Sequence, residues 1–203
     1  MKTLKKAQQF IEFSSLSLED REDFVPFVIV TDERDREFFV GFQEMPTEPK
    51  DQDQLADMIM ALCVVYGAVE VAFGSAAWSA EADVDDDSDV LPSQRPDRKE
   101  VAIVSAVNSG GVKDVSIASV VRESGKVGIG LWEQLPAVAI SGRFAEALHM
   151  GLKLSAKIPS EIRDFLREQI EAGPVQGIVG STMSVITEAR RTAMTIEEGM
   201  WEK

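Results

Sequence analysis

The sequence predicts an α+β fold built on a mostly antiparallel sheet. Two observations support this class: short β-branched segments separated by glycine turns fill the middle of the chain, and apolar residues recur at helical spacing near both ends. The element order reads roughly β-β-α-β-loop-β-β-β, with a packed helix and a C-terminal helical section. We expect residues 1–140 to form an α+β core domain and residues 141–203 to serve as an oligomerisation or docking element.

The residue pattern in the first third of the chain predicts a short helix, a hairpin and a longer helix. Apolar residues at helical spacing indicate an amphipathic helix over residues 3–13. The segments FVPFVIVTD and EFFVGFQEM read as two strands around the polar turn ERDR. The next helix, DQLADMIMALCVVYG, carries a wide apolar stripe, so we expect most of its surface to be buried and Gly67 to end it.

The remaining elements follow in order. AVEVAF is a strand that SAAWSAE extends, and an acidic and arginine-rich loop follows it. EVAIVSAVN, VKDVSIASVVRE and VGIGLWEQL then form a meander joined by the turns SGG and SGK. Ser141 is positioned to cap one helix and Ser160 to cap the next, EIRDFLREQIEA, which Gly173-Pro174 stops. TMSVITEARRTAM predicts a last helix.

The composition is that of a globular protein, and the single cysteine points to the cytoplasm. Of the 203 residues, 44% are hydrophobic and 28% charged. Cys63 cannot form an internal disulfide and lies in the apolar run MALCVVYG, which predicts a buried thiol. Residues 58–78 are long enough to span a bilayer. Gly67 and Glu70 interrupt them, however, so we expect a buried helix and a strand, and no membrane partner.

The net charge of −14 is concentrated in one section. Residues 32–89 contain 16 acidic and 3 basic residues, a net charge of −13. This balance disfavours direct nucleic-acid binding, which needs lysine and arginine to neutralise phosphates. Solubility is the simplest explanation. An acidic mimic of nucleic acid, blocking a basic protein through residues 81–89, stays open.

Metal and catalytic motifs are weak throughout the chain. Asp83, Asp85 and Asp87 have the spacing of a calcium loop, but Ser88 and Gln94 stand where such a loop needs glycine and glutamate. One cysteine and one histidine cannot supply a zinc site. We therefore expect no metal, no cofactor and no enzymatic activity.

The segment PSQRPDRKE is the strongest candidate for a binding site. Arg95 and Arg98 lie close together in the sequence, with Asp97 between them and Trp78 at the end of the preceding strand. Guanidinium forks suit carboxylates and phosphates, so these residues can clamp an anionic ligand or a partner. The structural alternative pairs both arginines with local acids while the prolines stiffen the loop.

The same stretch carries a resemblance. A tryptophan-containing strand end, AAWSAE, followed by PSQRPDRKE and a strand, resembles a pattern in uncharacterised bacterial and phage proteins. It covers roughly the middle third of the chain. The resemblance implies a prokaryotic or phage origin and no catalytic residues.

These observations lead to one functional hypothesis and two alternatives. We expect a non-enzymatic binding or assembly protein that acts as a homo-oligomer, with itself or another protein as its partner. One alternative is a protein that binds or sequesters a small anionic ligand such as a nucleotide through Arg95 and Arg98. The other is the acidic nucleic-acid mimic.

Overall fold

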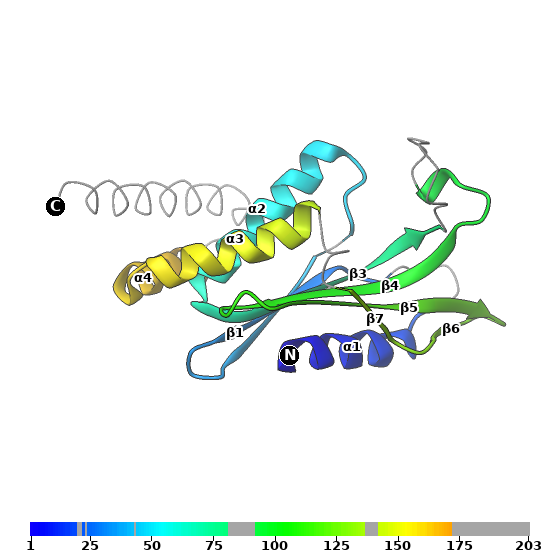
Figure 1. Cartoon of the computed structure of the whole chain (residues 1–203), viewed down its shortest axis with the longest axis horizontal. Helices are drawn as coiled ribbons and strands as arrows, with labels where there is room; N and C mark the ends of the chain where they lie inside the picture. Colours follow the sequence, from blue (N-terminus) through cyan, green and yellow to red (C-terminus); the bar gives the residue numbers. More distant parts are fainter. Residues whose placement is uncertain (20–21, 23, 43, 81–91, 137–141, 172–203) are drawn as a thin grey trace.

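The computed structural model has the predicted α+β fold. It describes residues 1–19, 22, 24–42, 44–80, 92–136 and 142–171 (Figure 1). The described elements, in chain order, are α1 (Lys2–Ser15), β1 (Phe27–Asp32), β2 (Glu37–Gly41), α2 (Pro49–Val65), β3 (Ala68–Ser79), η1 (Pro92–Gln94), β4 (Lys99–Asn108), β5 (Lys113–Glu123), β6 (Lys126–Ile129), β7 (Glu133–Leu135), α3 (Arg143–Lys157) and α4 (Ser160–Glu171). The acidic run, Ser141 and the last predicted helix lie outside the described residues.

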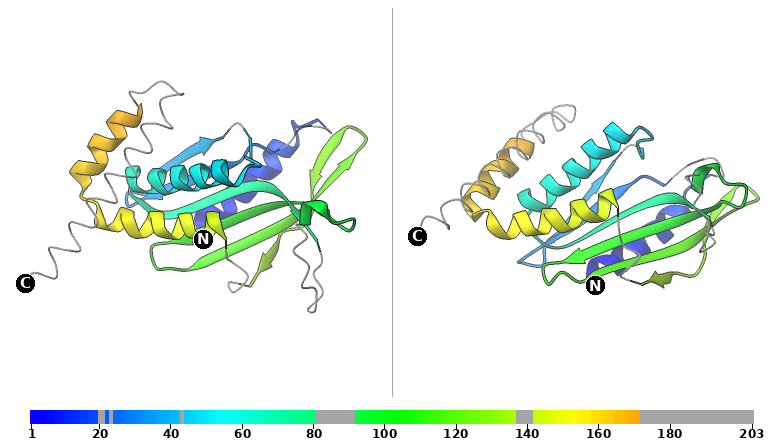
Figure 2. Two further views of the ribbon diagram at one scale, coloured as in Figure 1. Left: turned by 90° about the horizontal axis from the view of Figure 1, so that it is seen from above. Right: turned by 45° about the horizontal axis from the view of Figure 1, so that its top comes forward.

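The sheet is antiparallel and lies between two helical layers. Its strand order is β2-β1-β3-β4-β5-β6, and β7 pairs with β5 beside β6. Figures 1 and 2 show α1 against one face and α2 and α3 against the other. β1 is buried along its whole length because both of its faces are covered. An uninterrupted apolar run such as FVIV is typical of a strand buried on both sides.

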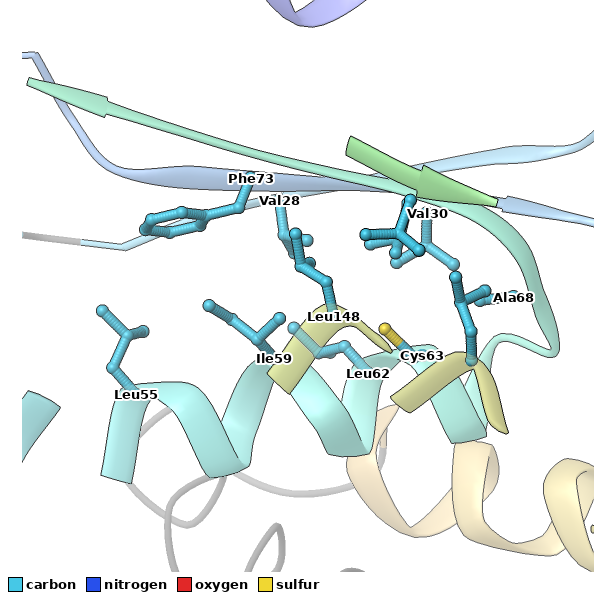
Figure 3. Close-up of a cluster of buried hydrophobic side chains, with 12 residues drawn as sticks. Val28, Val30, Leu55, Ile59, Leu62, Cys63, Ala68, Phe73 and Leu148 are labelled. Atoms are coloured by element: carbon cyan, nitrogen blue, oxygen red, sulfur yellow. The ribbon is translucent and has the colours of Figure 1, made fainter. Parts of the chain in front are cut away.

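The two faces of the sheet carry separate apolar clusters. Val28 and Val30 point towards α2 and α3, whereas Phe27 and Ile29 point towards α1. Figure 3 shows the cluster on the α2 and α3 side, where Leu148 lies between the sheet and α2. Helix α3 thus contributes to the same core as the strands before residue 140.

One expected strand is divided in two. VGIGLWEQL forms β6 and β7, which pair with the same neighbour, β5. Val120 lies opposite Ile129, but Ile117 lies opposite Glu133, so the three residues 130–132 lie opposite only two residues of β5, Ala118 and Ser119. This mismatch is a bulge, and Leu131 within it is 91% exposed.

Burial of Cys63 is confirmed. Its side chain is fully buried among apolar residues of α2 and α3, and this desolvation raises the pKa of the thiol to about 12. Within the described part of the chain, no helix is both long and apolar enough to cross a bilayer.

Candidate anion-binding site

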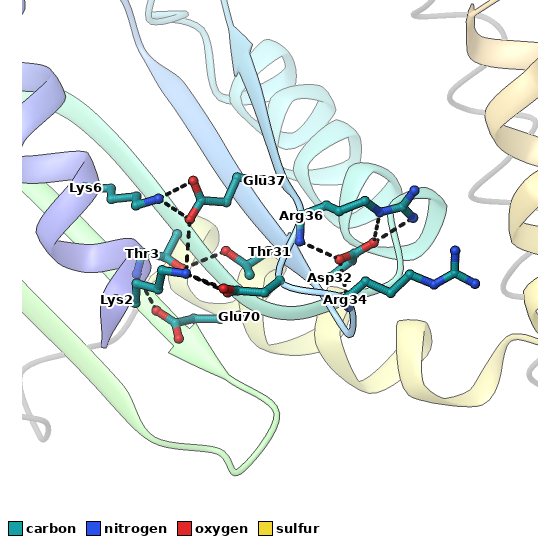
Figure 4. Close-up of polar contacts among 10 residues, drawn as sticks. Lys2, Thr3, Lys6, Thr31, Asp32, Arg34, Arg36, Glu37 and Glu70 are labelled. Atoms are coloured by element: carbon teal, nitrogen blue, oxygen red, sulfur yellow. Dashed lines mark hydrogen bonds and ion pairs between the residues drawn. The ribbon is translucent and has the colours of Figure 1, made fainter.

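The site begins at the turn between β1 and β2, which Asp32 organises. One carboxylate oxygen of Asp32 accepts hydrogen bonds from the N–H groups of Arg34, at 2.9 Å, and Arg36, at 2.8 Å. The other oxygen accepts from Arg36 Nε at 2.7 Å (Figure 4). The carboxylate therefore accepts two N–H groups of the turn. It fixes the backbone positions from which the side chains of Arg34 and Arg36 extend.

These contacts keep Asp32 ionised although its side chain is buried. Burial by itself raises the pKa of this carboxyl. The hydrogen bonds from the Arg36 backbone and side chain and from the Arg34 backbone outweigh burial, so the pKa lies below its usual value. Asp32 and Arg36 thus form a fixed ion pair at the base of the turn.

The C-terminal end of α2 forms the next wall. Gly67 follows the helix with φ +64°, the left-handed conformation that commonly ends a helix, and the sequence predicted this end. The bare Cα leaves room for the Arg163 guanidinium, because a Cβ on Gly67 would lie 2.6 Å from Arg163 Nη1. Tyr66, one residue earlier, stacks on Phe38 of β2 with ring centroids 4.2 Å apart.

Helix α4 supplies two more arginines from one of its faces. Arg163 and Arg167 are four residues apart, so both point in the same direction from the helix. Arg167 donates from Nη2 to the carbonyl of Val65 at 3.1 Å, and its guanidinium lies 5.6 Å from the centroid of the Tyr66 ring. Arg163 Nη1 lies 3.7 Å from a carboxylate oxygen of Glu33.

These elements enclose a pocket of about 340 Å³. The β1–β2 turn, the end of α2 and the first turns of α4 form its walls. The first N–H groups of a helix have no acceptor within the helix, and they carry partial positive charge. Ser160 therefore brings the positive end of α4 to the pocket wall. The lining residues are Asp32, Glu33, Arg34, Arg36, Tyr66, Gly67, Ser160, Arg163, Asp164 and Arg167.

Among the described residues that line the pocket, one positive charge has no carboxylate partner. Each lining carboxylate lies near an arginine: the pairs are Asp32 with Arg36, Glu33 with Arg163, and Asp164 with Arg167. The fourth arginine is Arg34. No hydrogen bond or ion pair within the described residues engages its guanidinium, which extends from the turn in Figure 4. The described lining is thus locally positive, although its β1–β2 turn belongs to the most acidic section of the chain.

One donor beside the pocket lacks an acceptor. Arg167 Nε is buried, and no acceptor in the described part of the chain reaches it. A buried N–H without an acceptor costs about 1–3 kcal/mol. Oxygen atoms of a bound anion or of water are the acceptors that such a site requires.

The predicted site residues do come together, at the other end of the sheet. Arg98 lies over the Trp78 ring, 4.7 Å from its centroid, and Arg95 Nε donates to Asp97 at 3.1 Å. Arg98 also donates to the carbonyl of Ser93. β3 runs for 12 residues, about 40 Å of strand, from the end of α2 towards this loop. Figure 1 shows the β1–β2 turn and the loop after β3 at opposite ends of the sheet. Arg95 thus pairs with a local acid, as the structural alternative predicted for both arginines, whereas Arg98 contacts an aromatic ring and a backbone carbonyl.

Sequence reasoning missed the arginine pocket. The turn ERDR was identified only as a hairpin turn, and EIRDFLREQIEA only as an amphipathic helix. The spacing of Arg163 and Arg167 places both on one helix face and was the available signal. Nothing in the sequence indicates that this face meets a turn about 130 residues earlier.

The other residues considered for chemistry do not extend the site. His149 is half-buried on α3, and its pKa lies below the usual value because of desolvation and the nearby Lys153 and Lys113. In the described ranges, no group of three or more histidine, cysteine or carboxylate side chains is placed to hold a metal ion. The acidic run of residues 83–89 lies outside those ranges.

Comparisons with protein-family models, with curated proteins and with solved structures find no match for this chain. The resemblance of AAWSAE and PSQRPDRKE to bacterial and phage proteins therefore stays a prediction.

Proposed function

We propose that this chain is a non-enzymatic binding protein that holds a small oxyanion, of the phosphate or carboxylate type, in the pocket between the β1–β2 turn and α4. The observation that supports this proposal is the convergence of four arginines on one pocket where, in the part of the chain that the structure describes, three carboxylates oppose them. Guanidinium groups bind carboxylates and phosphates through paired hydrogen bonds, and a helix N-terminus adds further donors.

The pocket favours the charged group of a ligand over a flat aromatic ring. Phe38 and Tyr66 stack on each other, and the guanidinium groups of Arg36 and Arg167 lie over their rings. Arg36 and Arg167 are held by these rings and by their carboxylates, so these two side chains lose little entropy when an anion binds. This arrangement supports recognition of an anionic group.

Calorimetric titration with inorganic phosphate and with acetate, in low-salt buffer, tests this proposal. Arg34→Gln combined with Arg163→Gln removes one guanidinium from each wall and leaves the Asp32–Arg36 pair intact. A hydrogen bond to a charged group contributes about 1.5–3 kcal/mol, so we expect the affinity for the bound anion to fall about 100-fold or more. The buffer has low salt because dissolved ions screen the attraction between the exposed arginines and the anion.

The matched control changes the loop that the sequence favoured. Arg95→Gln with Arg98→Gln alters the net charge equally but lies at the far end of the sheet, and we expect it to leave anion affinity unchanged. Circular dichroism melts establish that both variants are folded. If the control variant loses binding while the pocket variant keeps it, or if the unaltered protein binds neither anion at millimolar concentration, the proposal fails. Arg163→Lys separates charge from geometry, because lysine keeps the charge but lacks the planar fork.

A further inference from the structure

The free edge of β2 is a second surface with specific chemistry. β2 pairs with β1 on one side, and no strand in the described part of the chain lies on its other side. Phe39 in this strand is 49% exposed, as is Val25, and both side chains lie near Gly41. An open strand edge is a template for pairing with another strand.

Alternate residues of β2 direct their backbone groups towards this edge. Asp32 N–H donates to the carbonyl of Arg36 at 3.0 Å, and Phe42 N–H donates to that of Pro26 at 2.8 Å. Bonded pairs alternate along an antiparallel ladder, so the even-numbered residues of β2 bond to β1. The groups that face the open edge are the N–H and C=O of Glu37, Phe39 and Gly41.

We propose that a second copy of this chain pairs along this edge, antiparallel, with Phe39 opposite the same residue of the second copy. This register places Glu37 opposite Gly41 of the other copy and forms about six backbone hydrogen bonds. A shift by two residues in either direction loses one bonded pair, and in one direction it also sets Glu37 opposite Phe39 of the other copy. The edge is thus complementary to itself in one register.

The side chains of β2 match in the same register. Phe38 and Val40 are half-buried on the face towards α2, and the register sets each opposite the other across the two copies. On the opposite face the two Phe39 rings meet beside Phe10 and Phe27, with which each ring already packs. Aromatic and β-branched cross-strand pairs are among the favourable pairs in sheets.

Charges near this edge are paired within one chain. Lys2 Nζ lies 2.6 Å from a carboxylate oxygen of Asp35, and Lys6 pairs with Glu37 (Figure 4). Unpaired lysines commonly keep strand edges apart, but here the four charges sum to zero. These four side chains therefore add no net like charge between two copies at the edge, which favours a second copy over a partner selected by charge.

Native mass spectrometry and single-cysteine cross-linking of the full chain test this interface. We expect a species of twice the 22.3 kDa chain mass. In the proposed register the two copies of residue 39 are about 5.5 Å apart at Cα, so Phe39→Cys is expected to form an intermolecular disulfide on mild oxidation. Cys63 does not compete because its thiol is fully buried.

Exposed positions supply the control. The two copies of residue 37 lie about 14 Å apart in this register, so Glu37→Cys alone gives no disulfide, and the same holds for Gly41→Cys alone. A mixture of these two variants forms the cross-linked heterodimer, and this result does not depend on the packing of Phe39. A monomer at all concentrations overturns the proposal. So does a dimer in which neither Phe39→Cys nor the mixture cross-links.

Discussion

Gly67 connects the stability of this protein to the proposed anion binding, and Gly67→Ala separates the two contributions. Alanine at this position must adopt φ +64°, which costs about 1–2 kcal/mol for an L-residue. Its Cβ would also lie 2.6 Å from Arg163 Nη1 and 3.2 Å from Cζ, so the guanidinium must move. The variant thus combines backbone strain with displacement of one pocket arginine.

Gly111→Ala is the matched control for strain alone. Gly111 has φ +77°, and a Cβ there meets nothing within 4 Å. We expect Gly111→Ala to lower the free energy of unfolding by about 1–2 kcal/mol. Gly67→Ala also loses the Arg163–Glu33 pair. That pair adds at most about 1 kcal/mol, because the Glu33 side chain is 69% exposed and the charges lie 3.7 Å apart.

Urea denaturation measures the stability of both variants, and phosphate titration measures binding. We expect affinity to fall about 10- to 100-fold in Gly67→Ala, since one charge-assisted contact is lost, and to stay unchanged in Gly111→Ala. A folded Gly67→Ala protein that binds phosphate as tightly as the unaltered chain would refute the role assigned to Arg163. An equal loss of affinity in Gly67→Ala and Gly111→Ala would mean that general destabilisation, and not displacement of Arg163, weakens binding.

Three further predictions follow from buried groups. The pKa of Asp32 is lower in the folded protein than in the unfolded chain, where it is about 3.9. Ionisation of Asp32 therefore stabilises the fold above the unfolded pKa, and this stabilisation is lost as the pH falls through the lower folded pKa. Urea unfolding at about pH 7 and about pH 3 should show a smaller pH dependence in Asp32→Asn, and an unchanged dependence would contradict the ion pair. Cys63, with a pKa of about 12, should resist a thiol reagent at about pH 8 in the native protein and react once urea unfolds it; rapid native labelling would show that α2 and α3 open. Leu148→Ala should lower the free energy of unfolding by about 2–5 kcal/mol, whereas a loss below about 1 kcal/mol would mean that α3 is not part of the core.

Local pattern was enough to predict most elements of the fold. Alternation and helical periodicity depend on neighbours a few residues apart, so strands such as Lys113–Glu123 and helices such as Ser160–Glu171 were predictable to within a few residues. Gly67 as a helix end and Cys63 as a buried thiol depend on equally local features. The division of VGIGLWEQL was not predictable, because a bulge is a mismatch with the neighbouring strand and is set by pairing.

The arrangement of the arginines depends on contacts between distant parts of the chain. Arg34 and Arg36 belong to a hairpin turn, and Arg163 and Arg167 belong to a helix about 130 residues later. Neighbouring residues explain why Arg34 and Arg36 lie in a turn and why Arg163 and Arg167 lie on one helix face, but they do not explain why the two pairs meet. They meet because α3 packs on α2 through Leu148 and returns the chain to the end of α2. The sequence alone therefore determined most of the described secondary structure, since it follows from local sterics and periodicity. Only the tertiary structure decided which charges share a pocket, since that depends on burial of apolar surface between distant elements.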